Sequence, residues 1–400
     1  MVTGATEIDK DREDFAKDGS AGTPIAVVRT ETAAQVQQAV QWAAAHRVPV
    51  VPRGAGTGLS GGSSAVDGGI TISLERMRAV EVHPSCQVAI VEPGALNAEV
   101  KRAAAEHGLW YPPDPSSYEI CSIGGNRIKD VAGLSLLKRF VGSEGTLGII
   151  TRAILRLIPA QTARATLVSS YPTMTAASRA VVAIRSRVWP SMLELMDTAT
   201  INAVEDWRSH GMDRSTGALL IAQSDAPGAS CGSEVEVMRE CCEEAGADEI
   251  FTTTDPDESE LFIAARRNAF LVLEHCGSVL FEDVGVPMPL LPDLVDEVAA
   301  GAARCDIEIA VVAHAGHGNT HPILVYDATD PDSVARARRA FDEVMAVATK
   351  LGGTMTGEHG VGRAKKAALP DQLGTELIAL RRRIKDTLDP HGILNPGAVL

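Results

Sequence analysis

The sequence has few aromatic residues and no surplus of positive charge. Only 4% of the 400 residues are aromatic, against 45% apolar residues overall, so alanine and valine must supply most of the core. The formal net charge is −15 and no basic patch stands out, which argues against binding to nucleic acid or to an anionic membrane surface. A chain of this length and apolar content can form two globular domains.

The sequence also lacks C-x-x-C motifs and long apolar runs. The seven cysteines include no C-x-x-C pair, and an odd number leaves at least one unpaired, which fits reduced thiols in the cytoplasm. Met1 to Ser20 is acidic and lacks the apolar core of a secretory signal, and no apolar run approaches the length of a membrane span. We therefore expect a cytoplasmic protein, with any attachment to the inner membrane face being peripheral or through a partner.

The most informative stretch is a glycine-rich loop at 52–62, which follows an apolar segment at 48–51. The loop has five glycines, which lack the Cβ atoms that keep a backbone away from a ligand. Such a turn points successive N–H groups into one concavity that suits a phosphate. The loop contains G-x-G-x-x-G, but a Rossmann site needs a helix next, whereas 63–69 has turn residues and 70–74 reads as a strand. The pattern predicts a phosphate cradle between two strands, with a flexible surface loop as the alternative.

The rest of the first 160 residues alternates short strands with helices. Strands are expected at 23–29, 48–51, 70–74 and 87–92, and helices at 32–46 and, capped by Asn97, at 97–108. This predicts an α/β domain with the glycine loop on its ligand side. Two further glycine turns, at 121–126 and 141–150, indicate a long ligand that is contacted at several points.

From about residue 160 the pattern changes to longer strands and helices, which predicts an α+β domain with an antiparallel sheet under helices. The expected strands are 192–196, 218–223, 279–286 and 307–313, and the expected helices lie near 175–187, 232–245, 258–274, 292–304, 332–350 and 372–388.

Histidines gather directly after the strand 307–313. A strand end, a Gly/Asn turn and a returning strand can bring His314 and His321 to face one point, and imidazoles that converge with a carboxylate suit zinc, iron or manganese. The nearest candidate carboxylate is Glu358, in a second His/Gly-rich segment at 357–362. A structural loop histidine or a helix-entry turn is the alternative for either stretch.

Two other residues are candidates for catalysis. His359 lies beside Glu358, so their side chains diverge along an extended chain, and a neutral imidazole is a suitable general base near pH 7. Arg266 lies on a predicted helix, and an arginine fork is the usual clamp for a substrate carboxylate. A solvated basic helix face is the alternative for Arg266.

Taken together, these motifs resemble the flavin-linked D-2-hydroxyacid dehydrogenases, which include D-lactate dehydrogenase and the flavin subunit of glycolate oxidase. The resemblance runs nearly end to end, through 52–62, 112–126, 129–134, 140–150, 264–269, 282–284, 314–322, 357–362 and 394–397. It implies an α+β, two-domain flavoprotein of the vanillyl-alcohol-oxidase type. The implied parts are an FAD-binding α/β domain at 1–159, an antiparallel-sheet cap domain with a metal site at 160–375, and a C-terminal segment at 376–400 that returns to the FAD domain.

The resemblance also implies the site residues. The implied FAD contacts are Arg53, Gly54, Ala55, Gly56, Thr57, Gly58, Gly61, Gly62, Pro113, Ser122, Gly124, Gly125, Asn126, Glu144, Gly145, Ile150 and Asn395. The divalent metal (zinc, iron or manganese) would be held by His314, His321 and Glu358. His359 would be the base, and Arg266 would pair with the substrate carboxylate.

The implied reaction oxidises D-lactate or glycolate to the 2-oxoacid, with hydride transfer to flavin N5. A quinone, a cytochrome or an electron-transfer flavoprotein, rather than NAD, would reoxidise the flavin, and a homodimer or a partner subunit is expected. D-2-hydroxyglutarate is less favoured as the substrate, because Phe281 stands where that branch has a lysine.

Two departures from the family pattern keep alternatives open. His317 replaces an aspartate of the H-x-G-D-G-N pattern, and we expect it to change a turn rather than to add a metal ligand. After Asn126 the chain runs straight into Arg127, without a few dozen residues that help to cover the flavin in the family. Either the chain carries an internal deletion or the sequence omits a stretch. The alternatives are a flavin-free metal-binding or scaffold protein and a non-redox flavoprotein related to alkyl-glycerone-phosphate synthase.

Overall fold

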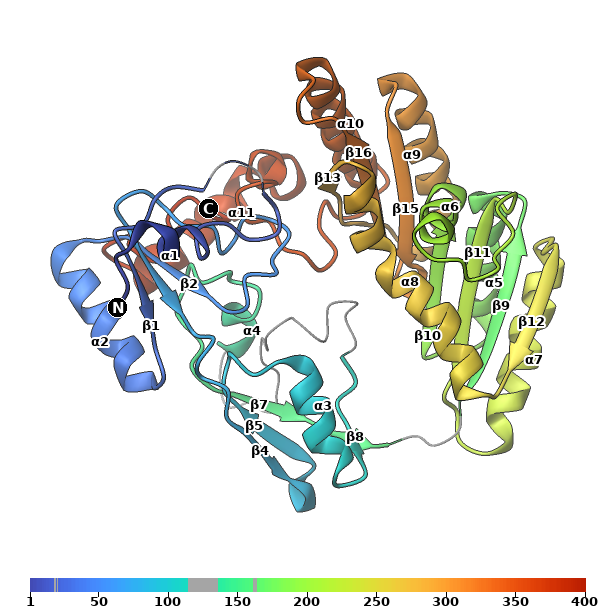
Figure 1. The fold of residues 1–400 in the computed structure, drawn as a ribbon, viewed down its shortest axis with the longest axis horizontal. Helices are drawn as coiled ribbons and strands as arrows, with labels where there is room; N and C mark the ends of the chain where they lie inside the picture. The colour runs from blue at the N-terminus through green and yellow to red at the C-terminus, as the bar shows by residue number, and fades with distance from the viewer. Residues whose placement is uncertain (18, 20, 114–135, 161–163) are drawn as a thin grey trace. The chain divides into compact units, whose positions relative to one another are not determined.

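The computed structural model describes residues 1–400 except 18, 20, 114–135 and 161–163. It divides into two compact units (Figure 1). One is formed by Met1–Ala160 together with His359–Leu400, and the other by Gln161–Glu358. The division therefore falls between two neighbouring candidate residues, Glu358 and His359.

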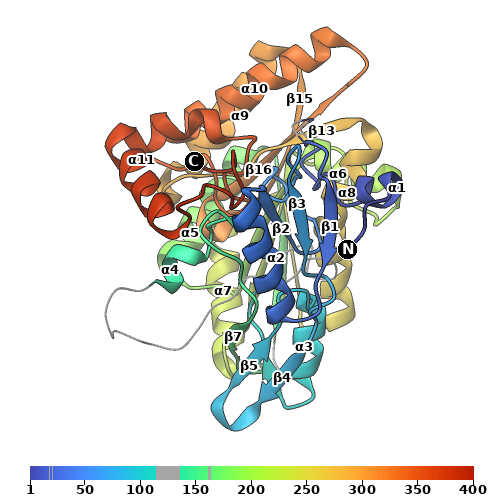
Figure 2. The same cartoon turned by 90° about the vertical axis from the view of Figure 1, so that its left-hand side faces the viewer.

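The first unit contains a small parallel sheet that carries the glycine loop. Its strands β1 (Ala26–Arg29), β3 (Ile70–Ser73) and β2 (Val50–Arg53) lie in that order, and helix α2 (Ala33–His46) packs on them (Figure 2). Thr32 caps α2, because its side chain accepts a hydrogen bond from the backbone N–H of Gln35. Parallel strands end at the same edge of a sheet, so the loop that follows β2 leaves from the edge where α/β proteins usually bind nucleotides.

A second sheet of this unit has three antiparallel strands, and a third pairs β6 (Leu109–Trp110) with β8 (Ile158–Pro159). The second sheet consists of β4 (Val80–His83), β5 (Val88–Val91) and β7 (Ala153–Arg156). Helix α3 (Asn97–Ala105) packs against it, but the predicted cap is wrong: Asn97 is the first helical residue, and Glu99 instead accepts a hydrogen bond from the Leu96 N–H. The other elements are α1 (Ala5–Asp9), η1 (Pro84–Cys86), α4 (Leu137–Phe140), η4 (Lys366–Ala368) and α11 (Leu369–Leu388).

The C-terminal segment joins the parallel sheet of the first unit. The Val50 N–H donates to the Ile393 carbonyl, and the Asn395 N–H donates to the Val50 carbonyl. Ile393 and Leu394 are buried in the same apolar cluster as Val50 and Ile72. The end of the chain is thus part of the core beside β2.

The second unit is built on an eight-stranded sheet in its described part, with the order β12-β9-β11-β10-β15-β16-β13 and with β14 paired to β16. All of its strand pairs are antiparallel. The strands are β9 (Ala165–Tyr171), β10 (Met192–Asp197), β11 (Ala218–Ser224), β12 (Glu249–Thr253), β13 (Ser278–Phe281), β14 (Val284–Gly285), β15 (Glu308–His314) and β16 (Asn319–Tyr326).

The single strand predicted at 279–286 is two strands in the structure. β13 and β14 keep one register against β16, but the residue opposite Glu282 is Pro322. Glu282 donates its N–H to the Pro322 carbonyl, and Pro322 has no N–H to return. The ladder is therefore interrupted at Glu282 and Asp283, the two buried acidic residues of this stretch.

Helices cover both faces of this sheet (Figure 1). One layer holds α5 (Met174–Arg187), α7 (Ala229–Glu244), α9 (Leu291–Cys305) and α10 (Pro331–Lys350), and the other holds α6 (Thr198–Trp207) and α8 (Pro256–Cys276). Short 3₁₀ turns lie at η2 (Met288–Leu290) and η3 (Ala315–His317). The core under α6 and α8 includes Val312, Ile201 and Leu273. No helix in the described ranges is long and apolar enough to cross a membrane.

Two glycines give a matched test of the packing in the second unit. A Cβ on Gly217 would lie 2.0 Å from the Pro172 carbonyl oxygen. At Gly232, within α7, no heavy atom of the described residues beyond its chain neighbours and the backbone of its own helix lies within 4 Å of that position. We expect Gly217→Ala to lower the free energy of unfolding by about 1–3 kcal/mol, and Gly232→Ala to raise it by about 0.5–1 kcal/mol. Chemical denaturation followed by circular dichroism measures both, and equal stabilities would contradict the packing at Gly217.

Candidate active site

Two histidines lie at the end where β15 turns into β16. His314 is the last residue of β15, η3 makes the turn, and His321 is the third residue of β16. His321 is paired with Val312, which lies two residues before His314 and faces the core under α6 and α8. Because side chains two residues apart share a face of a strand, both imidazoles face that side of the sheet. Their ring centroids are 5.1 Å apart.

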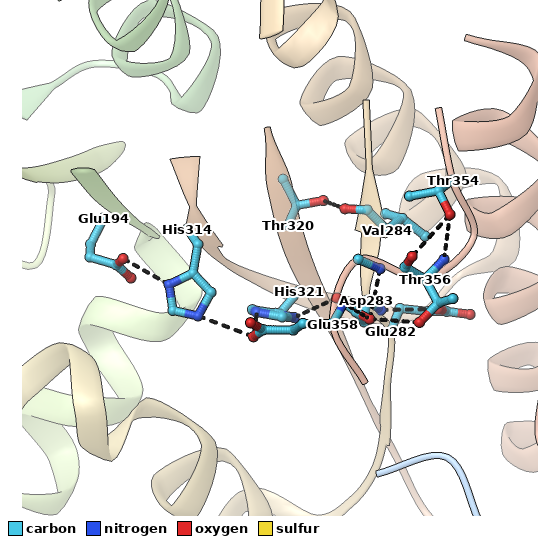
Figure 3. A network of polar contacts seen from close by, with 11 residues as sticks. Glu194, Glu282, Asp283, Val284, His314, Thr320, His321, Thr354, Thr356 and Glu358 are labelled. Carbon is cyan, nitrogen blue, oxygen red and sulfur yellow. Dashed lines mark hydrogen bonds and ion pairs between the residues drawn. The ribbon is translucent and has the colours of Figure 1, made fainter. Parts of the chain in front are cut away.

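Glu358 completes a cluster of three donor atoms (Figure 3). Its Oε1 lies 3.3 Å from His314 Nε2 and 3.3 Å from His321 Nε2. The three donor atoms all lie within 4.8 Å of one another. The structure thus brings together the three residues predicted as metal ligands, and two imidazole nitrogens with one carboxylate oxygen suit zinc, iron or manganese.

Asp283, which the sequence reasoning did not assign a role, supports this cluster. Its fully buried carboxylate accepts hydrogen bonds through Oδ2 from the backbone N–H groups of Gly357 (2.8 Å) and Glu358 (2.9 Å) and from the Thr356 hydroxyl (2.9 Å). Its Oδ1 lies 3.7 Å from His321 Nδ1. Asp283 therefore fixes the chain that carries Glu358 and lies beside the ring of His321. Its position inside an apolar stretch was the available signal.

Glu194 on β10 is the second residue that the sequence reasoning missed. It lies directly opposite His314 in the antiparallel ladder, and its Oε1 is 2.7 Å from His314 Nδ1. Its Oε2 is 2.9 Å from Nε of Arg266 on α8. Arg266 is only 6% exposed, so it is not part of a solvated basic face. The neighbouring Arg267 pairs instead with Glu260 on the same helix, at 2.8 Å.

The ionisable groups of this cluster shift one another's pKa values, because His314 lies between the carboxylates of Glu194 and Glu358. Burial works to lower the pKa of His314, but Glu194 and Glu358 outweigh it and raise the pKa to about 9. Burial works to raise the pKa of Glu358, but the two histidines hold it well below its usual range. The His321 pKa is lowered, chiefly by burial. A proton on His314 therefore supplies positive charge between two carboxylates, where a divalent cation could supply it instead.

The glycine loop of the first unit is supported by a buried arginine. Gly56 has a φ of +73°, and a Cβ on it would lie 2.0 Å from Nη2 of Arg53. Arg53 is 6% exposed, and its Nε lies 3.7 Å from Oδ1 of Asp11. Arg53, predicted as an FAD contact, therefore packs beneath the loop.

The loop is also bonded to the segment that follows His359. The Ser60 hydroxyl donates to the His359 carbonyl at 3.0 Å, and the Glu144 carboxylate accepts from the N–H groups of Val361 and Gly362, each at 2.8 Å. Asn395 Nδ2 donates to the carbonyls of Gly62 and Glu144, each at 2.7 Å. Glu144 and Asn395, also predicted as FAD contacts, thus use their side chains to hold this unit together.

The remaining predicted FAD contacts differ in their surroundings. Gly54, Ala55 and Thr57 on the loop are half-buried, as are Gly62, Gly145 and Ile150, whereas Gly61 is buried and Gly58 and Pro113 are exposed. Ser122, Gly124, Gly125 and Asn126 lie outside the residues that the structure describes.

Comparison with known proteins supplies the family. Residues 160–399 match the model of the C-terminal domain of FAD linked oxidases, and residues 24–139 match an FAD binding domain. The chain is 34% identical to the glycolate oxidase subunit GlcD of Bacillus subtilis (strain 168), over 94% of this chain and 88% of that protein. It is 29% identical to a D-lactate dehydrogenase of Archaeoglobus fulgidus, over 94% of this chain and 91% of that protein.

Solved structures agree on the fold. A p-cresol methylhydroxylase with substrate bound superposes with a TM-score of 0.80 at 15% identity, covering 100% of this chain and 93% of that one. A 4-ethylphenol oxidase from Gulosibacter chungangensis gives a TM-score of 0.77 at 17% identity, over 99% and 93% of the two chains. The predicted two-domain, vanillyl-alcohol-oxidase-type fold is therefore confirmed.

The donor cluster makes a testable prediction about metal binding. His314→Ala should lose bound metal, because it removes one of the three gathered donor atoms. His317→Ala is the matched control, since His317 lies exposed on the η3 turn and should leave the metal content unchanged. Elemental analysis of the purified variants decides between them. Unchanged metal in His314→Ala, or its loss in His317→Ala, would contradict this ligand set.

Proposed function

The chain belongs to the family of FAD-linked oxidases, and we propose that it is an FAD-dependent dehydrogenase of 2-hydroxyacids with a divalent metal in its active site. The observation that carries this proposal is the donor cluster of His314, His321 and Glu358, joined through Glu194 to a buried arginine. A 2-hydroxyacid carries a hydroxyl and a carboxylate on adjacent carbons. A metal beside a fixed cation suits that pair of groups.

The residues present fit both the divalent metal and the FAD that the proposal requires. Two nitrogen donors and one oxygen donor, with His321 buried, are suited to a catalytic divalent metal that keeps an open position. The glycine loop leaves the carboxyl edge of a parallel sheet and can present N–H groups to a pyrophosphate.

Arg266 supports a carboxylate substrate. Its Nη2 is buried and, among the described residues, has no hydrogen-bond partner, while its Nε faces Glu194. A buried donor left without an acceptor costs about 1–3 kcal/mol, more when the group is charged, so this position favours an anionic ligand. A substrate carboxylate would supply the acceptor.

Each residue then has a defined task. FAD, when bound, would supply the two-electron acceptor, and the metal a Lewis acid for the substrate hydroxyl. Arg266 would orient the carboxylate, and His359 would take the hydroxyl proton. The main chain at and after His359 is held by Ser60 and Glu144, which limits the positions that the imidazole can take.

Phe281 and Phe270 form an aromatic surface beside the donor cluster, called the Phe281 wall below, which favours a small monocarboxylate as the substrate. The ring of Phe281 lies 5.3 Å from that of His321 and 4.9 Å from that of Phe270, centroid to centroid. A second carboxylate beside such a wall would be desolvated without a partner. We therefore propose D-lactate or glycolate, the substrates named for the relatives, before D-2-hydroxyglutarate.

The names of the relatives also bear on the protein partners of this chain. The Bacillus subtilis and Escherichia coli proteins are named as subunits, so we propose a partner subunit or a second copy. The electron acceptor would be a quinone, a cytochrome or an electron-transfer flavoprotein.

One observation favours a second candidate, a flavin-free metal-binding protein. The match to the glycolate oxidase subunit extends over 415 residues, more than the 400 of this chain, so part of that match has no counterpart here. If the missing part covers the flavin, the chain would keep the metal site and lose the cofactor.

Flavin content and substrate oxidation separate the two candidates. The purified protein should absorb in the flavin region and reduce a dye with D-lactate or glycolate. Its kcat/KM for D-2-hydroxyglutarate should be lower by at least about tenfold, since the second carboxylate would meet the Phe281 wall. A colourless protein that takes up no added FAD would establish the flavin-free alternative.

The base assignment has its own test. His359→Ala should lower kcat by about 10²–10⁴-fold, the usual contribution of a positioned general base, while leaving bound flavin unchanged. His391→Ala is a suitable control because His391 is exposed. Near-normal dye reduction by His359→Ala would refute the assignment.

A further inference from the structure

Glu194 connects two parts of the candidate site that belong to different elements. It lies on β10 opposite His314 of β15, in register, and faces Arg266 on α8. The side chain is 14% exposed, so its charge is largely removed from water. Its two carboxylate oxygens have different partners. Oε1 is hydrogen-bonded to His314 Nδ1, and Oε2 forms an ion pair with Arg266 Nε.

The hydrogen bond to Oε1 determines which ring nitrogen of a neutral His314 carries the proton. When Oε1 accepts a hydrogen bond from Nδ1–H, the proton of a neutral His314 is held on Nδ1, and the lone pair is left on Nε2. Nε2 is the atom that lies 3.3 Å from Glu358. A carboxylate behind a metal-ligating imidazole also raises the basicity of the ligand, and losing such a partner typically weakens metal binding 10–100-fold.

The ion pair with Oε2 orients the arginine. Nε of Arg266 forms an ion pair with Glu194 at 2.9 Å, and both Nε and Nη2 are buried without a hydrogen-bond partner in the described chain. The ion pair leaves the terminal nitrogens of Arg266 available to an anionic ligand. One carboxylate therefore sets the direction of both the metal-ligating edge of His314 and the carboxylate-binding end of Arg266.

We propose that Glu194 is a positioning residue that sets the metal affinity of the site through His314 and directs Arg266 toward the substrate carboxylate. This inference rests on the proposed function, since it assumes that the His314, His321 and Glu358 cluster binds a divalent metal. It adds a residue that touches neither the metal nor the substrate.

Glu194→Gln tests the inference with little change in volume. A glutamine can accept from His314 only by presenting its NH₂ group to Arg266, and the reverse orientation leaves His314 without an acceptor. We expect the dissociation constant for Zn²⁺, measured on chelator-treated protein by competition with a chromophoric chelator, to rise 10–100-fold. Glu308→Gln, at the exposed start of β15, is the matched control and should bind Zn²⁺ like the parent.

A double variant covers the case in which Glu194→Gln fails to fold. Glu194→Met with Arg266→Met removes both members of the buried pair, which avoids leaving one charge unpaired. It should still bind Zn²⁺ 10–100-fold more weakly, because His314 has lost its acceptor.

The outcomes are distinct. Zn²⁺ affinity within twofold of the parent in a folded Glu194 variant would overturn the inference and leave the proposed function standing, even if the variant melts at a lower temperature. A parent chain that binds no Zn²⁺ while His314→Ala behaves identically would overturn both. Weaker Zn²⁺ binding in the Glu194 variants alone, with Glu308→Gln normal, supports the inference.

Discussion

The sharing of one carboxylate, that of Glu358, by two imidazoles determines most of what surrounds it. Glu358 lies 3.3 Å from both His314 and His321, and a charge that is partly removed from water needs a neighbouring group to balance it. Glu194 with Arg266 provides that balance on the His314 side, and Oδ1 of Asp283 lies 3.7 Å from Nδ1 of His321 on the other side. The strand register, the broken ladder at Pro322 and the position of α8 all serve to bring these groups to one face of the sheet.

The sequence predicted the parts of the site that are local in the chain. His314 and His321 are joined by one turn, and the glycine loop at 52–62 shows its own composition, so both could be recognised without knowing the fold. Glu194 could not be recognised in this way, because its role depends on lying opposite a residue 120 positions away. Asp283 showed only its position inside an apolar stretch, since its backbone partners lie 74 and 75 residues further on.

The secondary structure was predictable for a similar reason. The expected helices at 175–187 and 332–350 have strong caps and periodic apolar faces, and they appear as α5 and α10. The segment 279–286 was expected to be one continuous strand. Its interruption depends on Pro322 in another strand, which no local pattern reports.

The first unit is assembled from two distant pieces of chain, and this affects how the protein can be made. Ile393 and Asn395 bond to β2, and Asn395 also bonds to the glycine loop at Gly62. During synthesis the residues of the second unit, up to 358, leave the ribosome before residues 393–395, which bond to β2 and to the glycine loop. The first unit therefore cannot complete these bonds until after the whole of the second unit has been synthesised.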